Sequence, residues 1–408
     1  MTARSVASLF SGCGGMDLGF EGDFPVVRPS LTDSESQEFP GRSRWVDLPR
    51  LKFDNLFACD VYPKARVAWN SFFVPRGSGD EIYQLESVVE IAKRLSNKVP
   101  SELSDLDVVT GGFPCNDFSV AGKRLGFNSN KSHRGNQSLI DETVDEPAVE
   151  NRGMLYYWMR EFVRHTLPKV FFAENVKGLV SLGDAKEVIE RDFAGIRRSP
   201  YLVLPARVLR AFDYGVPQTR ERVIFIGLRR DAVRADVLRH FKKLGDLPPE
   251  LDLYPRISHG DEPGLRPLVT CRDAFVGLPE PDESNDLSHR AYSQAKYMGR
   301  RLQGQSEVSL DRPGPTIRAE HHGNIEYRRL SKSHGGQSEE LAHGLPERRL
   351  SVRECARIQT FPDSYEFVRP GEVSASDAYR LIGNAVPPLL AYRLAMRLDE
   401  VWDGVFRR

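Results

Sequence analysis

The residue types best suited to chemistry are a thiol, a carboxylate and two guanidinium groups, each beside a short apolar run typical of a β-strand. Because open α/β sheets carry their reactive groups at the ends of strands, this placement favours one shared site. Glycines and a proline fix a tight loop around the thiol, which argues against the buried structural role common for free cysteines. The four side chains are those of Cys115, Glu174, Arg220 and Arg222.

Such a set fits the activation of a pyrimidine ring. A thiolate that attacks carbon 6 of cytosine pushes electron density to carbon 5, provided that a carboxylic acid bonds ring nitrogen 3 and a cation holds the carbonyl oxygen. Carbon 5 can then accept a methyl group. A cysteine protease would need a histidine beside the thiol, and none of the nine histidines stands at an evident strand end.

A glycine-rich turn near the start of the chain is the second chemical feature. Gly12, Gly14 and Gly15 follow an apolar run, and glycine lets the backbone approach a ligand closely. Asp17 stands where a dinucleotide-binding fingerprint requires another glycine, which disfavours NAD or FAD. Asp60 ends a second apolar run, where a carboxylate can accept both ribose hydroxyls. The pair favours a nucleoside cofactor without a pyrophosphate, with a structural turn and a solvated acid as the alternative.

Strand-like and helix-like patterns alternate along much of the chain, which predicts an α/β fold with a mostly parallel sheet. The expected strands are 5–10, 55–60, 106–109, 170–173, 201–204 and 222–227, with the last two as a hairpin that closes the sheet in antiparallel fashion. The expected helices are 16–20, 82–95, 351–359 and 388–401, and the polar stretches 21–50 and 128–150 read as inserted loops. Ser351 and Glu354 form a predicted capping box.

The length of 408 residues exceeds the usual size of a single core, so we expect two domains. Residues 1–230 form the expected catalytic, cofactor-binding domain. A change to short segments rich in proline, glycine and charge marks residues 231–350 as a smaller, irregular domain. Residues 351–408 then return to complete the first domain.

Basic and acidic residues both total 57, so the net charge is zero and a nucleic-acid site must be a local patch. Two groups of basic residues are candidates for that patch, with a solvated surface as the alternative. The first group is Arg207, Arg210, Arg220, Arg222, Arg229 and Arg230. The second is Arg328, Arg329, Lys332, Arg348, Arg349, Arg353 and Arg357.

The five cysteines form no CxxC pair and have no nearby histidine at metal-ligand spacing, so we expect neither a zinc site nor a disulfide framework. The chain shows no charged-then-apolar leader and no apolar run long enough to cross a membrane. We therefore expect a cytoplasmic protein without membrane association.

A series of motifs, in matching order, resembles those of the DNA (cytosine-5) methyltransferase family of the bacterial restriction-modification type. The motifs are Phe10–Gly15, Gly112–Cys115, Arg152–Leu155, Glu174–Val176, Gln218–Arg222, Arg353–Pro362 and Gly383–Pro388. The likeness covers most of the chain apart from the middle of the second domain. It implies a Rossmann-like, S-adenosylmethionine-dependent methyltransferase domain joined to a target-recognition domain.

The resemblance also implies a role for each matching residue. Cys115 attacks the base covalently, Glu174 engages its ring nitrogen and amino edge, Arg222 holds its carbonyl oxygen, and Arg220 supports the loop. S-adenosylmethionine is the implied cofactor, in a pocket formed by Phe10, Gly12, Cys13, Gly14, Gly15, Asp60, Val61, Asp80, Leu155, Asn384 and Val386. Glu81 is the alternative to Asp80. The implied DNA contacts are Asn116, Ser119, Arg124 and Gln218.

Two departures from the family pattern shorten a side chain without changing its functional group. Asn116 replaces the usual glutamine after the nucleophile, and Asp60 replaces the usual glutamate at the ribose position. We expect altered reach rather than lost activity.

The implied activity is sequence-specific methylation of a flipped cytosine in duplex DNA, with the second domain reading the site from the major groove. The alternatives are methylation of a tRNA cytosine, a DNA-binding module without catalysis, and a nicotinamide oxidoreductase. A restriction endonuclease acting on the same site and a monomeric state complete the expectations.

Overall fold

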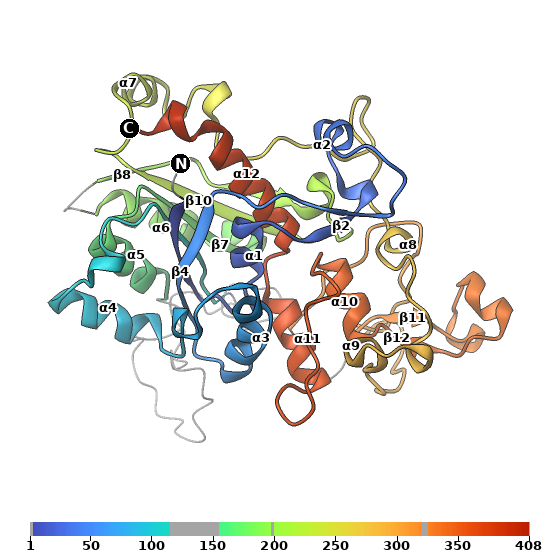
Figure 1. Cartoon of the computed structure of the whole chain (residues 1–408). Helices are drawn as coiled ribbons and strands as arrows, with labels where there is room; N and C mark the ends of the chain where they lie inside the picture. The colour runs from blue at the N-terminus through green and yellow to red at the C-terminus, as the bar shows by residue number, and fades with distance from the viewer. Residues whose placement is uncertain (1–2, 115–154, 197–199, 320–324, 408) are drawn as a thin grey trace.

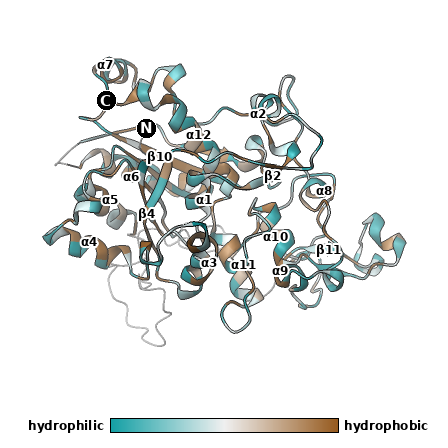
Figure 2. Cartoon of the chain, viewed as in Figure 1, coloured by the Kyte–Doolittle hydropathy of each residue, from teal (hydrophilic) through white to brown (hydrophobic). Residues whose placement is uncertain are grey.

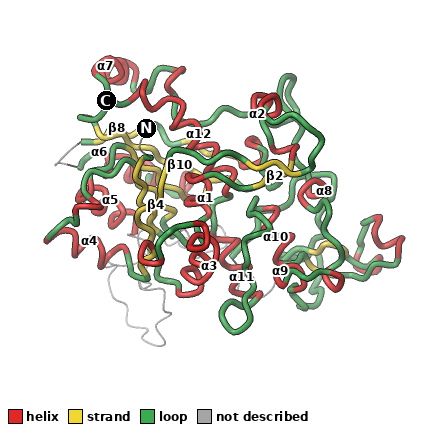
Figure 3. The backbone as a smooth tube through the Cα atoms, viewed as in Figure 1, coloured by secondary structure: helices red, strands yellow, loops and turns green. Residues whose placement is uncertain are grey.

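A computed structural model describes residues 3–114, 155–196, 200–319 and 325–407. A twisted central sheet with helices on both faces forms the larger body, and a smaller, mostly irregular body lies to one side of it (Figure 1). Loops make up most of the smaller body, whereas the strands gather in the larger one (Figure 3). We call these two parts the sheet body and the second body.

The central sheet is eight-stranded and mostly parallel, which confirms the predicted fold class. Its order is β5-β4-β1-β6-β7-β10-β8, with β9 paired to β10. The parallel strands are β1 (Arg4–Leu9), β4 (Phe53–Cys59), β5 (Tyr83–Gln84), β6 (Val108–Gly112) and β7 (Val170–Val176). The antiparallel part comprises β8 (Tyr201–Val203), β9 (Arg207–Arg210) and β10 (Glu221–Arg229). The predicted antiparallel pairing of 201–204 with 222–227 is confirmed.

Alternate residues of each central strand pack into two different hydrophobic clusters, as the two-residue period of a strand requires. On β7, Val170 and Phe172 face one cluster, and Phe171 and Ala173 face the other. Helices α1 (Gly15–Glu21), α3 (Pro63–Phe73) and α12 (Pro388–Val405) cover the first face. Helices α4 (Val88–Asn97), α5 (Leu155–Thr166) and α6 (Ala185–Ala194) cover the second.

Helix α12 packs directly against α1, although the two are far apart in the chain (Figure 1). Gly19 permits this close approach, because a Cβ atom there would lie 2.4 Å from the Cβ of Ala391. The segment around α7 (Ala235–Leu244) also belongs to the sheet body, since Val233 pairs with Phe406 and Arg397 donates to the carbonyl of Asp252. Residues 233 and 252, just after the expected boundary at residue 231, thus contact the last helix of the sheet body and the residue after it.

The stretch 21–50 is not the plain loop that its polarity predicted. It contains β2 (Pro25–Val27) paired with β3 (Trp45–Asp47), and the capped helix α2 (Asp33–Glu38). Arg393 of α12 anchors it by an ion pair with Glu35 and a 2.9 Å hydrogen bond to the carbonyl of Ser30. The predicted helix 82–95 is wrong at its start, because residues 83 and 84 form β5 and Ser87 caps α4.

The second body contains α8 (Cys271–Ala274), α9 (Leu287–Arg290), β11 (Tyr327–Arg329) and β12 (Arg348–Arg349). Hydrophilic residues predominate in its outer segments beyond β11 (Figure 2). Helices α10 (Val352–Ile358) and α11 (Ala375–Asn384) lie between the two bodies. The capping box predicted for α10 is confirmed, because Ser351 and Glu354 each accept a hydrogen bond from the other's backbone N–H.

Candidate active site

A cavity of about 470 Å³ opens where the parallel strands end, within the size range of roughly 300 to 1,000 Å³ usual for small-molecule sites. Strand register explains why the predicted residues meet there, since Leu9 lies opposite Gly111 and Gly112 lies opposite Glu174. Helix α11 and the segment after it close another side. The predicted residues lining the cavity are Phe10, Gly12, Gly15, Asp60, Val61, Leu155, Glu174, Arg220, Arg222, Asn384 and Val386.

The turn after β1 requires unusual backbone conformations. Phe10, Gly12 and Gly14 all have positive φ angles, of 54°, 56° and 80°. Gly15 allows close contact with the opposite wall, because a Cβ atom there would lie 2.2 Å from the carbonyl oxygen of Val386. A larger residue at that position would push the wall apart. The glycines therefore set the shape of the cavity through the backbone alone.

Cys13 and Gly14, both predicted in the cofactor pocket, do not line the cavity. Burial raises the pKa of the Cys13 thiol, whose Sγ lies 3.6 Å from the carbonyl oxygen of Leu381. A Cβ atom at Gly14 would lie 2.6 Å from the ring of Phe73. These two residues shape the turn from behind rather than contacting a ligand.

Asp60 joins the end of β4 to the glycine turn. Its carboxylate accepts hydrogen bonds from the backbone N–H groups of Gly12, at 3.0 Å, and Tyr62, at 2.9 Å. Burial raises the pKa of Asp60, whereas these N–H donors lower it. A carboxylate has about four acceptor positions, so capacity remains for hydroxyl groups of a ligand.

Asp17 holds the same turn from below, a role that sequence reasoning missed. This buried carboxylate accepts hydrogen bonds from Ser8 Oγ and Ser11 Oγ, both at 2.5 Å, and from Trp69 Nε1 at 2.7 Å. Burial raises its pKa, and the three donors oppose that effect. Asp17 thus ties β1, the turn and α3 together. The sequence feature that could have indicated this role is the position of Asp17 in the first turn of α1, just after the glycines.

Glu174 and Arg222 form a buried ion pair in the cavity wall, with Oε1 and Nε 2.5 Å apart. They come from the antiparallel neighbours β7 and β10. Gly112 leaves room for the acid, because a Cβ atom there would lie 2.9 Å from Glu174 Oε2. The next residue along β7, Asn175, donates a 3.1 Å hydrogen bond to the carbonyl of Phe113. The acid is therefore fixed beside the loop that leads toward position 115.

Cys115 itself lies outside the described residues, as do the predicted DNA contacts Asn116, Ser119 and Arg124. Phe113 and Pro114, which precede the thiol, both line the cavity.

Arg220 and Gln218 connect the cavity wall to the second body. Arg220 donates to the carbonyls of Ile317 and Gly383, each at 3.0 Å. Gln218 is fully buried, and its amide donates at 2.7 Å to Gln359 and accepts at 3.2 Å from the N–H of Ile317. This corrects the expected DNA contact at Gln218, because its amide is enclosed and bonded within the protein.

Gln359 extends this connection to the cofactor side of the cavity. Its amide donates to the carbonyls of Ile382, at 2.6 Å, and Ala385, at 3.0 Å. The pair Gln218 and Gln359, which we call the amide relay, therefore links the second body to the segment that lines the cavity.

Asp80 does not reach the cavity, which corrects its expected role beside an adenine. It is exposed on a short 3-10 turn, Asp80–Ile82, whereas Glu86 and Ser87 line the cavity after β5. Arg94 holds the Glu86 carboxylate at 2.8 Å. The strand that places Glu86 has two residues, too few to be recognised by periodicity.

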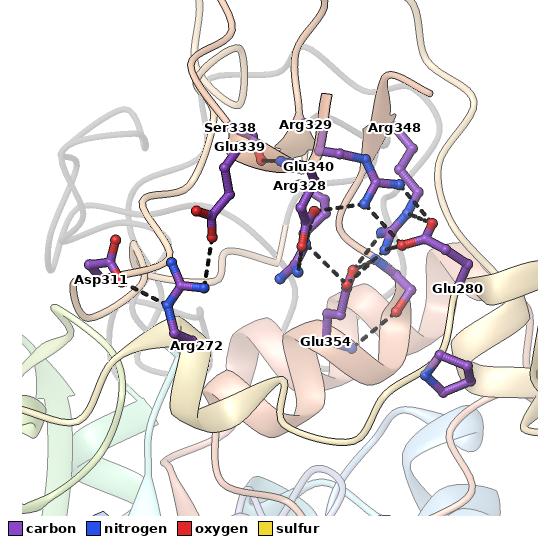
Figure 4. A network of polar contacts seen from close by, with 12 residues as sticks. Arg272, Glu280, Asp311, Arg328, Arg329, Ser338, Glu339, Glu340, Arg348 and Glu354 are labelled. Carbon is purple, nitrogen blue, oxygen red and sulfur yellow. Dashed lines mark hydrogen bonds and ion pairs between the residues drawn. The ribbon is translucent and has the colours of Figure 1, made fainter. Parts of the chain in front are cut away.

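The second basic group does not form the predicted surface patch. Its arginines lie inside the protein, and Figure 4 shows three of them around the buried Glu354 and the partly buried Glu280 and Glu340. Arg328 pairs with Glu340, Arg329 with Glu280 and Glu340, and Arg348 with Glu280 and Glu354. Farther along, Arg353 pairs with Asp286 and Arg357 with Asp363. We give the name arginine–glutamate network to Glu280, Arg328, Arg329, Glu340, Arg348 and Glu354.

Neither a metal-binding cluster nor a membrane-spanning helix occurs in the described part of the chain. It holds no cluster of histidine, cysteine, aspartate or glutamate able to bind a metal ion. None of its helices has the length and apolar character needed to cross a membrane.

Comparison with known proteins identifies the family. The model of the C-5 cytosine-specific DNA methylase family matches residues 80–400. The Type II methyltransferase M.BspRI of Lysinibacillus sphaericus is 32% identical over 97% of this chain and 81% of its own length. M.BsuRI of Bacillus subtilis is 30% identical over 96% of this chain and 78% of its own length.

Solved structures support the same fold. The Dnmt2 methyltransferase of S. pombe superposes with a TM-score of 0.57 at 15% identity, over 98% of this chain and 99% of that one. A putative DNA modification methyltransferase from an E. coli prophage gives 0.55 at 19% identity, over 98% and 100%. With the family model and the curated relatives covering most of the sequence, the chain belongs to the DNA (cytosine-5) methyltransferase family.

Proposed function

We propose that this protein transfers a methyl group from S-adenosylmethionine to carbon 5 of a cytosine in a specific duplex DNA sequence. The observation that carries the proposal is that a single cavity is lined both by the glycine turn with Asp60 and by the Glu174–Arg222 pair. The first set suits a nucleoside, and the second suits a pyrimidine edge. A methyl donor and its acceptor base must meet in one such space.

The cofactor side of the cavity fits S-adenosylmethionine, which supplies the methyl group when bound. Asp60 offers free acceptor positions for ribose hydroxyls. Phe10, Val61 and Val386 provide apolar wall, and Gly12 and Gly15 expose backbone without a side chain in the way.

On the base side, Glu174 bonds ring nitrogen 3 and the amino group of cytosine, while Arg222 orients the carboxyl group and holds the carbonyl oxygen. The Cys115 thiolate forms a bond to carbon 6, and the displaced electron pair makes carbon 5 nucleophilic. Carbon 5 takes the methyl group, the electron pair of the broken bond stays on the donor sulfur, and S-adenosylhomocysteine leaves. Loss of the carbon 5 proton to solvent and departure of the thiolate then restore the ring.

The cytosine has to leave the helix to reach this cavity, because the reactive groups lie in the wall of an enclosed space at the sheet edge. Extrusion of a base costs a few kcal/mol, which contacts to phosphates and to the base edge offset.

The direct test is bisulfite sequencing of genomic DNA from a host without its own cytosine methylation, after expression of the parent, Cys115→Ser and Glu174→Gln. We expect protected cytosines in one short sequence context with the parent only. A soluble parent that leaves every cytosine unprotected, yet methylates tRNA in vitro, would overturn the proposal in favour of an RNA substrate.

A further inference from the structure

Some basic residues of the second body are enclosed by ion pairs, whereas others are exposed and free to meet a ligand. Whereas the arginine–glutamate network is enclosed, the surface loop 294–303 exposes Lys296, Arg300 and Arg301. We propose that this loop is a DNA-contacting element of the second body. The inference rests on the proposed function and adds the surface that holds the duplex.

The loop combines unpaired charge with exposed apolar side chains. Met298 and Leu302 are 67% and 51% exposed, high values for large apolar residues. Among the described residues, no carboxylate forms an ion pair with Lys296, Arg300 or Arg301; Arg300 has a single 3.3 Å hydrogen bond to the carbonyl of Gly335. Arg272, an exposed arginine of the same body, is by contrast paired with both Asp311 and Glu339.

This composition fits duplex DNA better than a protein or a small anion. Lysine and arginine side chains bind phosphates, which supply most of the sequence-independent affinity for DNA. Apolar side chains between such cations can enter a groove and pack against sugars and bases. Met298 and Leu302 alternate with the cations along the loop, so both kinds of contact are available on one surface.

A buried guanidinium makes the base of the loop rigid. Arg349 donates to the carbonyls of Ala295, at 2.8 Å, Gly304, at 2.7 Å, and Lys296, at 3.3 Å, and its charge lies 4.1 Å from the ring centre of Tyr327. The loop is also held at its middle, where the N–H of Met298 donates to the side chain of Gln305 at 2.9 Å. A loop ordered in advance loses less conformational freedom on binding.

The same guanidinium connects the loop to the small sheet of the second body. Arg349 belongs to β12 and also donates to the carbonyl of Ile325, just before β11. One side chain therefore fixes both the base of the exposed loop and the segment that leads into β11.

The test measures binding of a duplex by fluorescence anisotropy over a range of salt concentrations, with parent protein and with the double variant Arg300→Ala/Arg301→Ala. The probe is a duplex that contains the site found by bisulfite sequencing. We expect about tenfold weaker binding at moderate salt, and a salt slope smaller by roughly 2, since each lost phosphate contact removes about 0.9. Met298→Ala should weaken binding without changing the slope.

The matched control is Arg272→Ala, which removes a similarly exposed arginine that is already ion-paired. We expect this variant to bind the duplex with the same affinity and the same salt slope as the parent protein. Melting temperature and S-adenosylmethionine affinity, unchanged in all variants, show that the fold and the cavity are intact. Lys296→Gln gives a second, milder removal of charge.

The outcomes separate this inference from the proposed function. If the parent methylates DNA while the double variant keeps parent affinity and slope, the loop does not hold DNA and the proposed function stands. If the parent neither binds nor methylates duplex DNA, both proposals fail. Reduced affinity with an unchanged salt slope in the double variant would also contradict phosphate contact by these arginines.

Discussion

The cavity of the sheet body and the interior of the second body both contain buried acids facing arginines, yet the two regions use them differently. In the cavity, Glu174 faces open space that a ligand can enter, and strand register sets its position. In the second body, Glu354 is enclosed on every side, and its carboxylate holds Arg348 at 2.8 Å and 3.0 Å. The same pair of residue types thus faces an open cavity in one place and is enclosed by ion pairs in the other.

The second body needs such ion pairs because it has little regular structure to hold it together. Around Glu280, burial opposes ionisation, but hydrogen bonds from Arg329 and Arg348 lower the pKa of the carboxyl to about 2. The acid therefore stays charged throughout the physiological range. Whether an arginine can meet a ligand therefore depends on its surroundings in the fold more than on its position in a basic run of the sequence.

We expect substitution of Glu174 to change the rate of methyl transfer strongly and the stability of the fold little. Glu174→Gln keeps the shape of the side chain but cannot donate a proton to the ring nitrogen of the base. We expect methyl transfer to fall by roughly 10²- to 10⁴-fold. Initial rates with a radiolabelled methyl donor give this loss. A steep drop in melting temperature, without the expected loss of rate, would mean that Glu174 stabilises the fold instead of acting on the base.

Glu354 should show the opposite behaviour. Glu354→Ala leaves Arg348 and Arg328 with less opposing charge inside the protein, and breaking a buried pair in this way costs about 3 to 5 kcal/mol of unfolding free energy. Urea unfolding followed by circular dichroism measures it.

The control for Glu354 is Asp311→Ala, which breaks the exposed pair with Arg272 and should leave the free energy of unfolding almost unchanged. If the two variants lose equal free energy of unfolding, the buried ion pair of Glu354 stabilises the protein no more than the exposed pair of Asp311.

A buried histidine of the sheet body, outside the cavity, provides a pH-dependent test. His259 is fully buried between Ser258 Oγ and the carbonyl of Pro29, both 2.8 Å from its ring nitrogens. Burial lowers its pKa to about 4 from 6.5. Between these values the unfolded chain binds the proton first, so stability decreases as the pH falls from 6.5 to 4, by about 3 kcal/mol for this group.

Melting temperatures at several pH values in that window, for the parent and His259→Gln, isolate the contribution. The variant should lose stability less steeply with acid. Parallel curves for the two proteins would show that His259 is not the group responsible.

The amide relay between the two regions should give the smallest effect. Gln218→Met preserves the volume of the side chain but removes both hydrogen bonds to Gln359 and Ile317. We expect a loss of about 1 to 3 kcal/mol in stability, because buried partners remain unsatisfied. Because the relay ends on the wall that lines the cavity, S-adenosylmethionine should also bind several-fold more weakly by calorimetry. If Gln218→Met is less stable but binds S-adenosylmethionine as tightly as the parent, the amide relay has a structural role only.

Sequence reasoning succeeded where the cause of a structure is local. Buried parallel strands such as 170–173 are continuous apolar runs, and the capping box of Ser351 and Glu354 needs no partner beyond one helical turn. The glycine turn, Asp60, Glu174 and Arg222 line one cavity for a similar reason, since each stands at a strand end.

It failed where distant partners decide. The pairing of Arg329 with Glu280, 49 residues away along the chain, is one case that no local pattern reveals. Likewise, nothing near Gln218 in the sequence shows that Gln359 encloses it. Strands of two or three residues, such as β5 and β2, are too short for a period to appear, so Glu86 was not recognised as part of the cavity wall.

The packing of α12 on α1 has a consequence for how the enzyme is made. The first helix, with the glycine turn just before it, gains its full covering only when residues 388–405 have been synthesised and have left the ribosome. Contacts between segments so far apart in a chain form late and slowly. A nascent chain therefore carries its motifs for most of its synthesis without a finished cofactor site, and methylation begins only after synthesis reaches this last helix.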